Sequence, residues 1–220
     1  SHEPTAHAMI RKGESACRIH NNCSGKHCGF LTVTQHLKAG PEYVEVDHPL
    51  QRMIRQTTED VTGETVAGYG IDGCSAPNFA VTVAGLARAM QAFAAARDGG
   101  DSRARAMHRL TRAMATHPEL VAGEGRACTE LMRAMGHTVA LKTGAEAVFV
   151  AILPEQNRGI ALKIVDGGTR GAEAAIAALL VRAGVLDPAH PAALKRLGGV
   201  QRNWRGLETG TIRTAPGFPR

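Results

Sequence analysis

Two apolar segments joined by a short turn constrain the fold of this chain more than any other feature. Residues 147–153 and 160–165 are dominated by aliphatic side chains, and the segment between them begins with Pro154 and ends with Gly159. Apolar runs of this length bounded by turn formers are typical of strands, and a short connection makes the two strands antiparallel. We therefore predict an antiparallel hairpin here, preceded by a strand at 138–141.

The rest of the pattern is mainly helical, so the predicted hairpin must pack against helices. Apolar residues recur at helical spacing after Pro49, and Ser24 and Asp101 are suitable residues to begin a helix. These patterns predict helices at about 24–37, 49–61, 79–97, 102–116, 129–135 and 172–183. The alternation of strands with helices favours a layered α/β (α+β) domain.

We expect a single domain over residues 1–220, with an extended polar tail at 201–220. Within this tail, residues 208–214 are suited to form an edge strand. Aromatic residues make up only 4% of the chain, so the core must be built from Ala, Leu, Val, Ile and Met.

Charge and cysteine content restrict the class of protein. The net charge is +6, but the arginines are spread over helical faces and few aromatic residues are available to stack on bases, so we expect no nucleic-acid partner. No segment reaches the run of about 18 apolar residues that spans a bilayer, and the first residues do not resemble a signal peptide. The 5 scattered cysteines argue for a reducing compartment. We expect a cytoplasmic protein without membrane contact.

Reactive side chains are concentrated in residues 20–28. Cys23 and Lys26 are three residues apart, so at a helix start they face the same side. The N–H groups of a helix N-terminus lower the pKa of a nearby thiol and attract anions. Cys23 is therefore a nucleophile, a metal ligand or a tightly packed small residue, and the sequence leaves these three open. His20 is as well suited to bonding the backbone as to chemistry.

A second reactive group is Asp72-Gly73-Cys74, at the end of a predicted strand. Loops beyond strand ends collect functional side chains in α/β proteins, although Asp-Gly is also a common turn dipeptide. Cys74 and Cys23 together would supply two thiolates to a zinc site, and Asp72 or His27 would be an ordinary further ligand.

A third group, Lys142-Thr143-Gly144, lies at the end of one predicted strand and before the next. It resembles the Lys-Thr-Gly that lines the substrate cleft of penicillin-recognising serine enzymes beside a Ser-x-x-Lys nucleophile. A tripeptide recurs too often by chance to carry that assignment alone. We expect Glu146, four residues after Lys142, to anchor the turn rather than to take part in chemistry.

Four segments, taken in order, resemble the L-asparaginase II family, which is the Rhizobium etli type of asparaginase. They are residues 20–27, 69–74, 115–123 and 142–146, and the resemblance extends from about residue 2 to the tail at 202–206. The octapeptide His-Asn-Asn-Cys-Ser-Gly-Lys-His at 20–27 is long enough to be specific.

This resemblance implies a fold like that of serine β-lactamases and glutaminases, a mixed antiparallel sheet flanked by helices. It implies that the protein hydrolyses L-asparagine to L-aspartate and ammonia. Cys23, Lys26 and Cys74 match the family's Zn²⁺ ligands with Asp72 beside them, and Lys142 matches a catalytic lysine near the nucleophile. Lysine is an unusual metal ligand because it must lose a proton, with an ordinary pKa of about 10.4.

We further predict that the substrate is contacted by His20, Asn22, Ser24 and Asp72, and that the protein forms a homodimer. The family's nucleophile is the serine of a Ser-x-x-Lys, whereas no serine in this sequence has a lysine three residues later. We therefore expect the nucleophile to lie outside residues 1–220, in an N-terminal third that precedes them or in a separate N-terminal fragment.

Two alternatives to an asparaginase stay open from the sequence. The first is a non-catalytic zinc-binding module that has lost its nucleophile. The second is a cysteine hydrolase in which Cys23 acts with His20 or His27.

Overall fold

The computed structural model describes residues 3–218, which belong to two compact units, Ser1–Thr82 and Val83–Arg220. Both combine helices with small antiparallel sheets, which confirms the α/β (α+β) class expected from the sequence. The more specific β-lactamase-like fold and the single domain over 1–220 stay predictions. Within residues 3–218 no helix has the length and apolar character that a membrane span requires.

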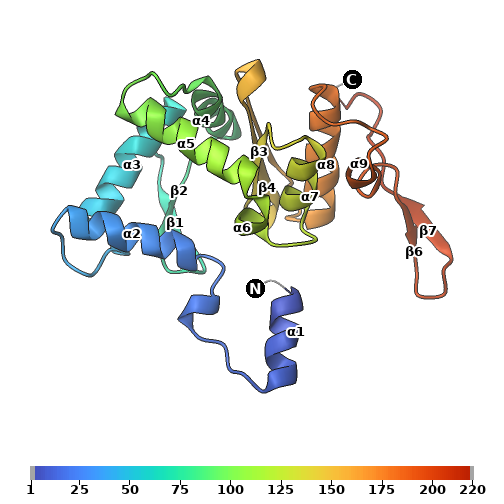
Figure 1. Ribbon diagram of the computed structural model, residues 1–220, viewed down its shortest axis with the longest axis horizontal. Helices are drawn as coiled ribbons and strands as arrows, with labels where there is room; N and C mark the ends of the chain where they lie inside the picture. Colours follow the sequence, from blue (N-terminus) through green and yellow to red (C-terminus); the bar gives the residue numbers. More distant parts are fainter. Residues whose placement is uncertain (1–2, 219–220) are drawn as a thin grey trace. The chain divides into compact units, whose positions relative to one another are not determined.

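The first unit is mainly helical (Figure 1). Its helices are α1 (Glu3–Lys12), α2 (Ser24–His36) and α3 (Pro49–Thr62), with a single turn η1 (Arg18–His20) before α2. The predicted helices at 24–37 and 49–61 are confirmed, whereas α1 was not predicted. Helix α3 has the expected proline in its first turn, and the His48 ring accepts a hydrogen bond from the Leu50 amide at 3.1 Å. Gly63 ends it with φ of 66°.

A short hairpin follows, formed by β1 (Tyr69–Ile71) and β2 (Pro77–Phe79). The rings of Tyr69 and Phe79 lie opposite each other with centroids 6.4 Å apart. This pairing explains why the predicted helix start at residue 79 is wrong: Phe79 is held in the strand, and the next helix begins at Val83. Residues 72–76 form the tight turn between the strands, closed by a 2.9 Å bond from the Asp72 amide to the Ala76 carbonyl.

The second unit is built on a three-stranded antiparallel sheet of order β3-β4-β5. The strands are β3 (Ala140–Thr143), β4 (Val148–Leu153) and β5 (Arg158–Lys163), which confirms the predicted strand and hairpin. Single 3-10 turns, η2 (Ala145–Ala147) and η3 (Pro154–Gln156), connect them.

Helices cover both faces of this sheet (Figure 1). The main core lies between one face, which carries Leu141, Phe149 and Ala151, and helices α7 (Ala127–Ala134) and α8 (Thr169–Arg182). The opposite face carries Ala140 and Ile152, packed against α4 (Val83–Ala95) and α5 (Ser102–Thr116). Because side chains alternate along a strand, Lys142 shares the α4–α5 face with Ala140.

Strand β5 and helix α4 approach each other closely at Gly159. A β-carbon at this position would lie 2.3 Å from both the Ala87 carbonyl oxygen and the Gln91 amide nitrogen. No side chain fits in that space, so the approach requires glycine. The glycine expected from sequence to complete a turn therefore also sets the packing of α4 on the sheet.

Short helices α6 (Pro118–Ala122) and α9 (Pro191–Leu194) complete the helical layer of this unit. The sequence correctly predicts a break at Pro118, but the proline also begins α6 as its first residue. Arg196, whose side chain is 3% exposed, pairs with Glu130 at 2.7 Å and Glu173 at 3.3 Å. This buried cation ties the segment after α9 to α7 and α8.

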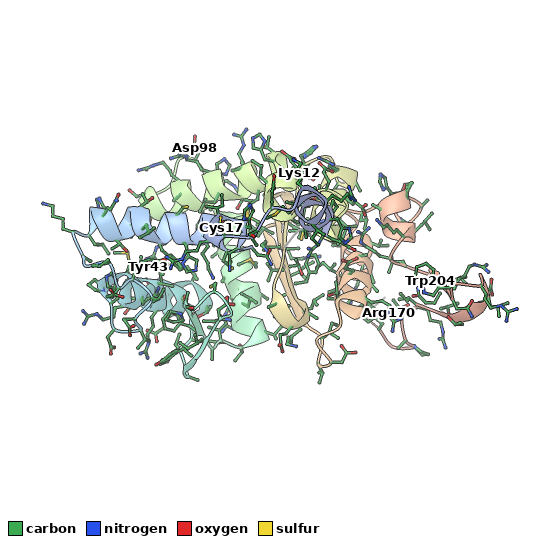
Figure 2. All side chains as sticks on the ribbon, turned by 90° about the horizontal axis from the view of Figure 1, so that it is seen from below. Lys12, Cys17, Tyr43, Asp98, Arg170 and Trp204 are labelled. Atoms are coloured by element: carbon green, nitrogen blue, oxygen red, sulfur yellow. The ribbon has the colours of Figure 1, made fainter. Side chains whose placement is uncertain are left out.

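A further antiparallel hairpin follows α9 and is formed by β6 (Val200–Arg202) and β7 (Glu208–Thr211). Trp204 in its loop is fully exposed (Figure 2). The Asn203 side-chain oxygen accepts hydrogen bonds from the Arg205 and Leu207 amides, both at 3.0 Å, and so fixes the loop. Strand β7 lies within the region 208–214 for which the sequence predicts a strand.

Candidate functional site

Three side chains from two segments of the first unit converge on one point. Cys23 precedes α2 as its N-cap residue, and Asp72 and Cys74 lie in the turn between β1 and β2. One ligand atom from each of the three lies within 4.8 Å of the other two. The Asn21 side-chain oxygen accepts a 2.8 Å hydrogen bond from the Cys23 amide and fixes the entry into α2. The structure thus brings together two reactive groups that lie far apart in the sequence.

Lys26 reaches the same point from the first turn of α2. Its Nζ lies 3.2 Å from the Cys74 Sγ and 3.5 Å from the Asp72 Oδ2. It also lies 5.8 Å from the centroid of the Phe30 ring, one turn further along α2. Partial burial acts to lower the pKa of Lys26, but the bond to Cys74 and the neighbouring charges outweigh it, so this pKa lies above that of an ordinary lysine. In the metal-free protein Lys26 is therefore an ammonium ion.

The pKa values of Cys23 and Asp72 shift in opposite directions. Burial raises the pKa of the Cys23 thiol; Lys26 acts to lower it, but Cys74 and Asp72 oppose this. Desolvation acts to raise the pKa of Asp72, yet the charge and hydrogen bond of Lys26 outweigh it and hold that pKa below its usual range. The result for Cys23 differs from the sequence-based expectation of a lowered thiol pKa, because burial together with Cys74 and Asp72 outweighs the lowering effect of Lys26.

This donor set fits a zinc ion. Two thiols and a carboxylate, all half-buried, are ligand types that Zn²⁺ takes. Zn–S bonds of about 2.3 Å place two sulfur atoms on one ion no more than about 4.6 Å apart. The donor atoms of Cys23 and Cys74 lie within 4.8 Å of each other. Lys26 could serve as a further ligand only after losing its proton; as an ammonium ion it is instead a charge partner of Asp72.

The other predicted substrate-binding residues flank this cluster in sequence. Asn22 and Ser24 are the neighbours of Cys23 on either side, with Asn22 exposed and Ser24 half-buried. His20 lies in η1, where its Nδ1 is 3.0 Å from the Cys17 amide nitrogen and 3.4 Å from the Cys17 Sγ. Their assignment to substrate binding stays a prediction.

His27 is engaged away from the cluster. Its Nδ1 lies 2.8 Å from the Tyr43 hydroxyl, and its ring contacts those of Phe30 and Tyr43 with centroids 5.5 Å away in each case. The contacts of His20 with Cys17 and of His27 with Tyr43 give no support to a Cys23–His pair. They also leave Asp72, rather than His27, as the group that lies beside the two thiols.

Lys142 belongs to the second unit, at the exposed end of β3. Its Nζ donates a hydrogen bond to the carbonyl oxygen of Thr143, the next residue. The Thr143 amide donates in turn to the buried Cys128 Sγ at 3.3 Å. As predicted, the Lys-Thr-Gly segment lies at a strand end with its backbone held by the core.

Two aromatic residues were not predicted from the sequence: Phe30, whose ring faces the Lys26 ammonium, and Tyr43, which contacts His27. Phe30 lies four residues after Lys26, and this helical spacing is a signal that could have identified it. Tyr43 lies in the connection between α2 and α3, and no sequence pattern links that segment to His27.

A family model described as L-asparaginase II matches residues 1–214. The family, together with the site, defines the class as an asparaginase-type amidohydrolase. The chain belongs to the L-asparaginase II family, as its motifs indicate. No curated protein sequence matches the chain significantly.

Proposed function

We propose that this protein hydrolyses the side-chain amide of L-asparagine to give L-aspartate and ammonia, and that it carries one Zn²⁺ per chain in the cluster around Cys23. The observation that carries this proposal is the convergence of Cys23, Asp72 and Cys74, with Lys26 beside them. Family membership supports amide hydrolysis, and the donor set supports the metal.

In this proposal Cys23 and Cys74 bind the metal, each as a thiolate, with Lys26 as a third ligand. A bound zinc ion supplies positive charge that can orient and polarise a carbonyl group. Asp72 accepts hydrogen bonds from the substrate or from water near the metal and so orients them. Its pKa below the usual range keeps it an acceptor at neutral pH.

The nucleophile in this proposal is a serine outside residues 1–220, paired with a lysine in a Ser-x-x-Lys. The serine hydroxyl attacks the amide carbonyl carbon while the lysine takes its proton. The lysine returns this proton to the leaving nitrogen, ammonia departs and an ester of the serine remains. Water then attacks the ester carbonyl, which releases L-aspartate and restores the serine hydroxyl. Lys142 contributes a positive charge that favours loss of the proton from the serine hydroxyl. The exposed amine and the rigid strand end of Lys142 suit this role.

His20, Asn22 and Ser24 are proposed to contact the substrate from the segment that leads into α2. Their imidazole, amide and hydroxyl groups match the polar groups of an amino acid. A homodimer in the cytoplasm is also part of the proposal, motivated by the family and by the unpaired cysteines.

The test is to measure ammonia and aspartate released from L-asparagine by the complete protein and by residues 1–220 alone. The complete protein should release the two products in equal amounts, and residues 1–220 should release neither. Turnover by residues 1–220 alone would contradict an external serine. Zinc binding by the complete protein without turnover would instead favour a non-catalytic zinc module, the alternative suggested by the lack of a Ser-x-x-Lys in this sequence.

A further inference from the structure

The turn after Lys142 contains two consecutive residues in the left-handed conformation. Glu146 has φ of 54° and ψ of 37°, and Ala147 has φ of 61°. This region favours glycine, because in other residues the β-carbon crowds the backbone. Two such residues in succession mean that the turn stores backbone strain.

The core and the sheet maintain this conformation. Ala147 is 5% exposed within the main core, and its carbonyl oxygen accepts a 3.1 Å hydrogen bond from the Ile164 amide. A 2.7 Å bond from the Gly144 amide to the Val148 carbonyl closes the turn. Strained residues that their surroundings hold in this way concentrate at functional sites.

The carboxylate of Glu146 does not stabilise the turn in which it lies. The side chain is exposed, and among residues 3–218 no hydrogen bond or ion pair holds its carboxylate. The expectation that Glu146 anchors the turn is therefore wrong, since backbone bonds and Ala147 anchor it. A glycine would adopt this conformation without strain, so the glutamate is not explained by the needs of the fold.

We propose that Glu146 is a specificity-determining residue whose carboxylate binds the α-ammonium group of an amino-acid substrate. The inference rests on the proposed function, because it takes Lys142 as part of the active site. Lys142 lies near the end of β3 and Glu146 lies in the connection that leads from β3 to β4, so both are at one end of the sheet. The substrate carries an ammonium group, and a carboxylate carried by a turn with a fixed backbone is an acceptor that forms strong charge-assisted hydrogen bonds with it.

The test compares L-asparagine with succinamate, which has the same amide and carboxylate but no α-amino group. In the complete protein, Glu146→Gln should lower kcat/KM for L-asparagine by roughly 10- to 100-fold, the scale of a lost hydrogen bond between charged groups. The value for succinamate should stay within about twofold, because this substrate has no ammonium group to lose. Glu155→Gln is the matched control, since Glu155 is an exposed glutamate in the turn at the other end of β4.

A second variant, Glu146→Gly, distinguishes a role of Glu146 in substrate binding from a role in stabilising the turn. Glycine relieves the strain, so the melting temperature should rise, while the preference for L-asparagine over succinamate should fall as in Glu146→Gln. An active wild type whose Glu146→Gln variant retains its preference would overturn this inference and leave the proposed function standing. A complete protein that hydrolyses neither substrate would overturn both.

Discussion

The Nζ of Lys26 lies 3.2 Å from the Sγ of Cys74, although 48 positions separate the two residues in the chain. The contact joins the first turn of α2 to the turn between β1 and β2. Because Lys26 is an ammonium ion in the metal-free protein, its charge lies among the donor atoms that would hold zinc. Metal binding with Lys26 as a ligand must therefore release a proton from this lysine.

Lys142 is predicted to matter for turnover and not for stability. In the complete protein, Lys142→Met should lower kcat by roughly 100-fold or more, the usual scale for the loss of one positioned electrostatic group. Zinc content and melting temperature should change little, because Lys142 is exposed and lies outside both the metal cluster and the core.

Lys163 offers a matched control for this substitution. It is an exposed lysine at the same end of the sheet, and its Nζ likewise donates to the carbonyl of the following residue. Lys163→Met should leave kcat near the wild-type value. Equal turnover by wild type and Lys142→Met would contradict a catalytic role and show that Lys142 is an ordinary exposed lysine.

The sequence predicted the sheet of the second unit well, because its strands are apolar and end at strong turn formers such as Pro154 and Gly159. The sequence predicted secondary structure less well where a contact with a distant residue overrides the local pattern. Phe79 continues an alanine-rich helical pattern, yet its pairing with Tyr69 draws it into a strand.

In the candidate site, too, the sequence identified residue types but not the properties that depend on folding. From their residue types, Cys23 and Cys74 were candidates for the two thiolates of a zinc site, while the roles of nucleophile and of packed small residue stayed open for Cys23. The raised pKa of Cys23 was not predictable, since it depends on burial and on neighbours that only folding brings close. The strain at Glu146 was equally hidden, because left-handed conformations of glutamate have no sequence signature.

Gly159 is predicted to be essential for the packing of α4 on β5. Gly159→Ala should lower the free energy of unfolding by about 1–3 kcal/mol, since the new methyl group overlaps backbone atoms that cannot move independently. Denaturant unfolding measures this change. Gly99→Ala is the control, because a β-carbon there meets nothing within 4 Å; equal stability of the two variants would rule out the close approach.

Glu130 is predicted to stabilise the fold in a pH-dependent way. Burial acts to raise its pKa, but the bonds and charges of Lys195 and Arg196 outweigh this and lower it. A lowered pKa in the folded state gives stability that is present above the ordinary glutamate pKa of about 4.3 and is lost as the pH falls through the folded value.

Glu130→Gln should therefore reduce the free energy of unfolding by about 1–3 kcal/mol at pH 7, because the buried Arg196 loses one of its two anionic partners. The difference from wild type should shrink as the pH is lowered below about 4. Glu208→Gln, which breaks an exposed pair with Arg202, should have little effect at either pH. A difference that stays constant with pH would refute the ionic origin of this stabilisation.

Zinc binding by the cluster of Cys23, Asp72 and Cys74 underlies the proposed function, and elemental analysis of the purified protein measures it directly. The wild type should contain about one zinc per chain, and Cys74→Ser should lose most of it, because a hydroxyl is a far weaker zinc ligand than a thiolate. Two other cysteines serve as controls. Cys28 is exposed on α2, and Cys128 is buried in the core of the second unit, where it accepts a hydrogen bond from Thr143.

Cys28→Ser and Cys128→Ser should both retain the wild-type zinc content, even if the second variant melts at a lower temperature. Among these three variants, we expect loss of zinc in Cys74→Ser alone. Equal zinc content in wild type and Cys74→Ser, measured on folded protein, would contradict the assignment of this cluster as a zinc site.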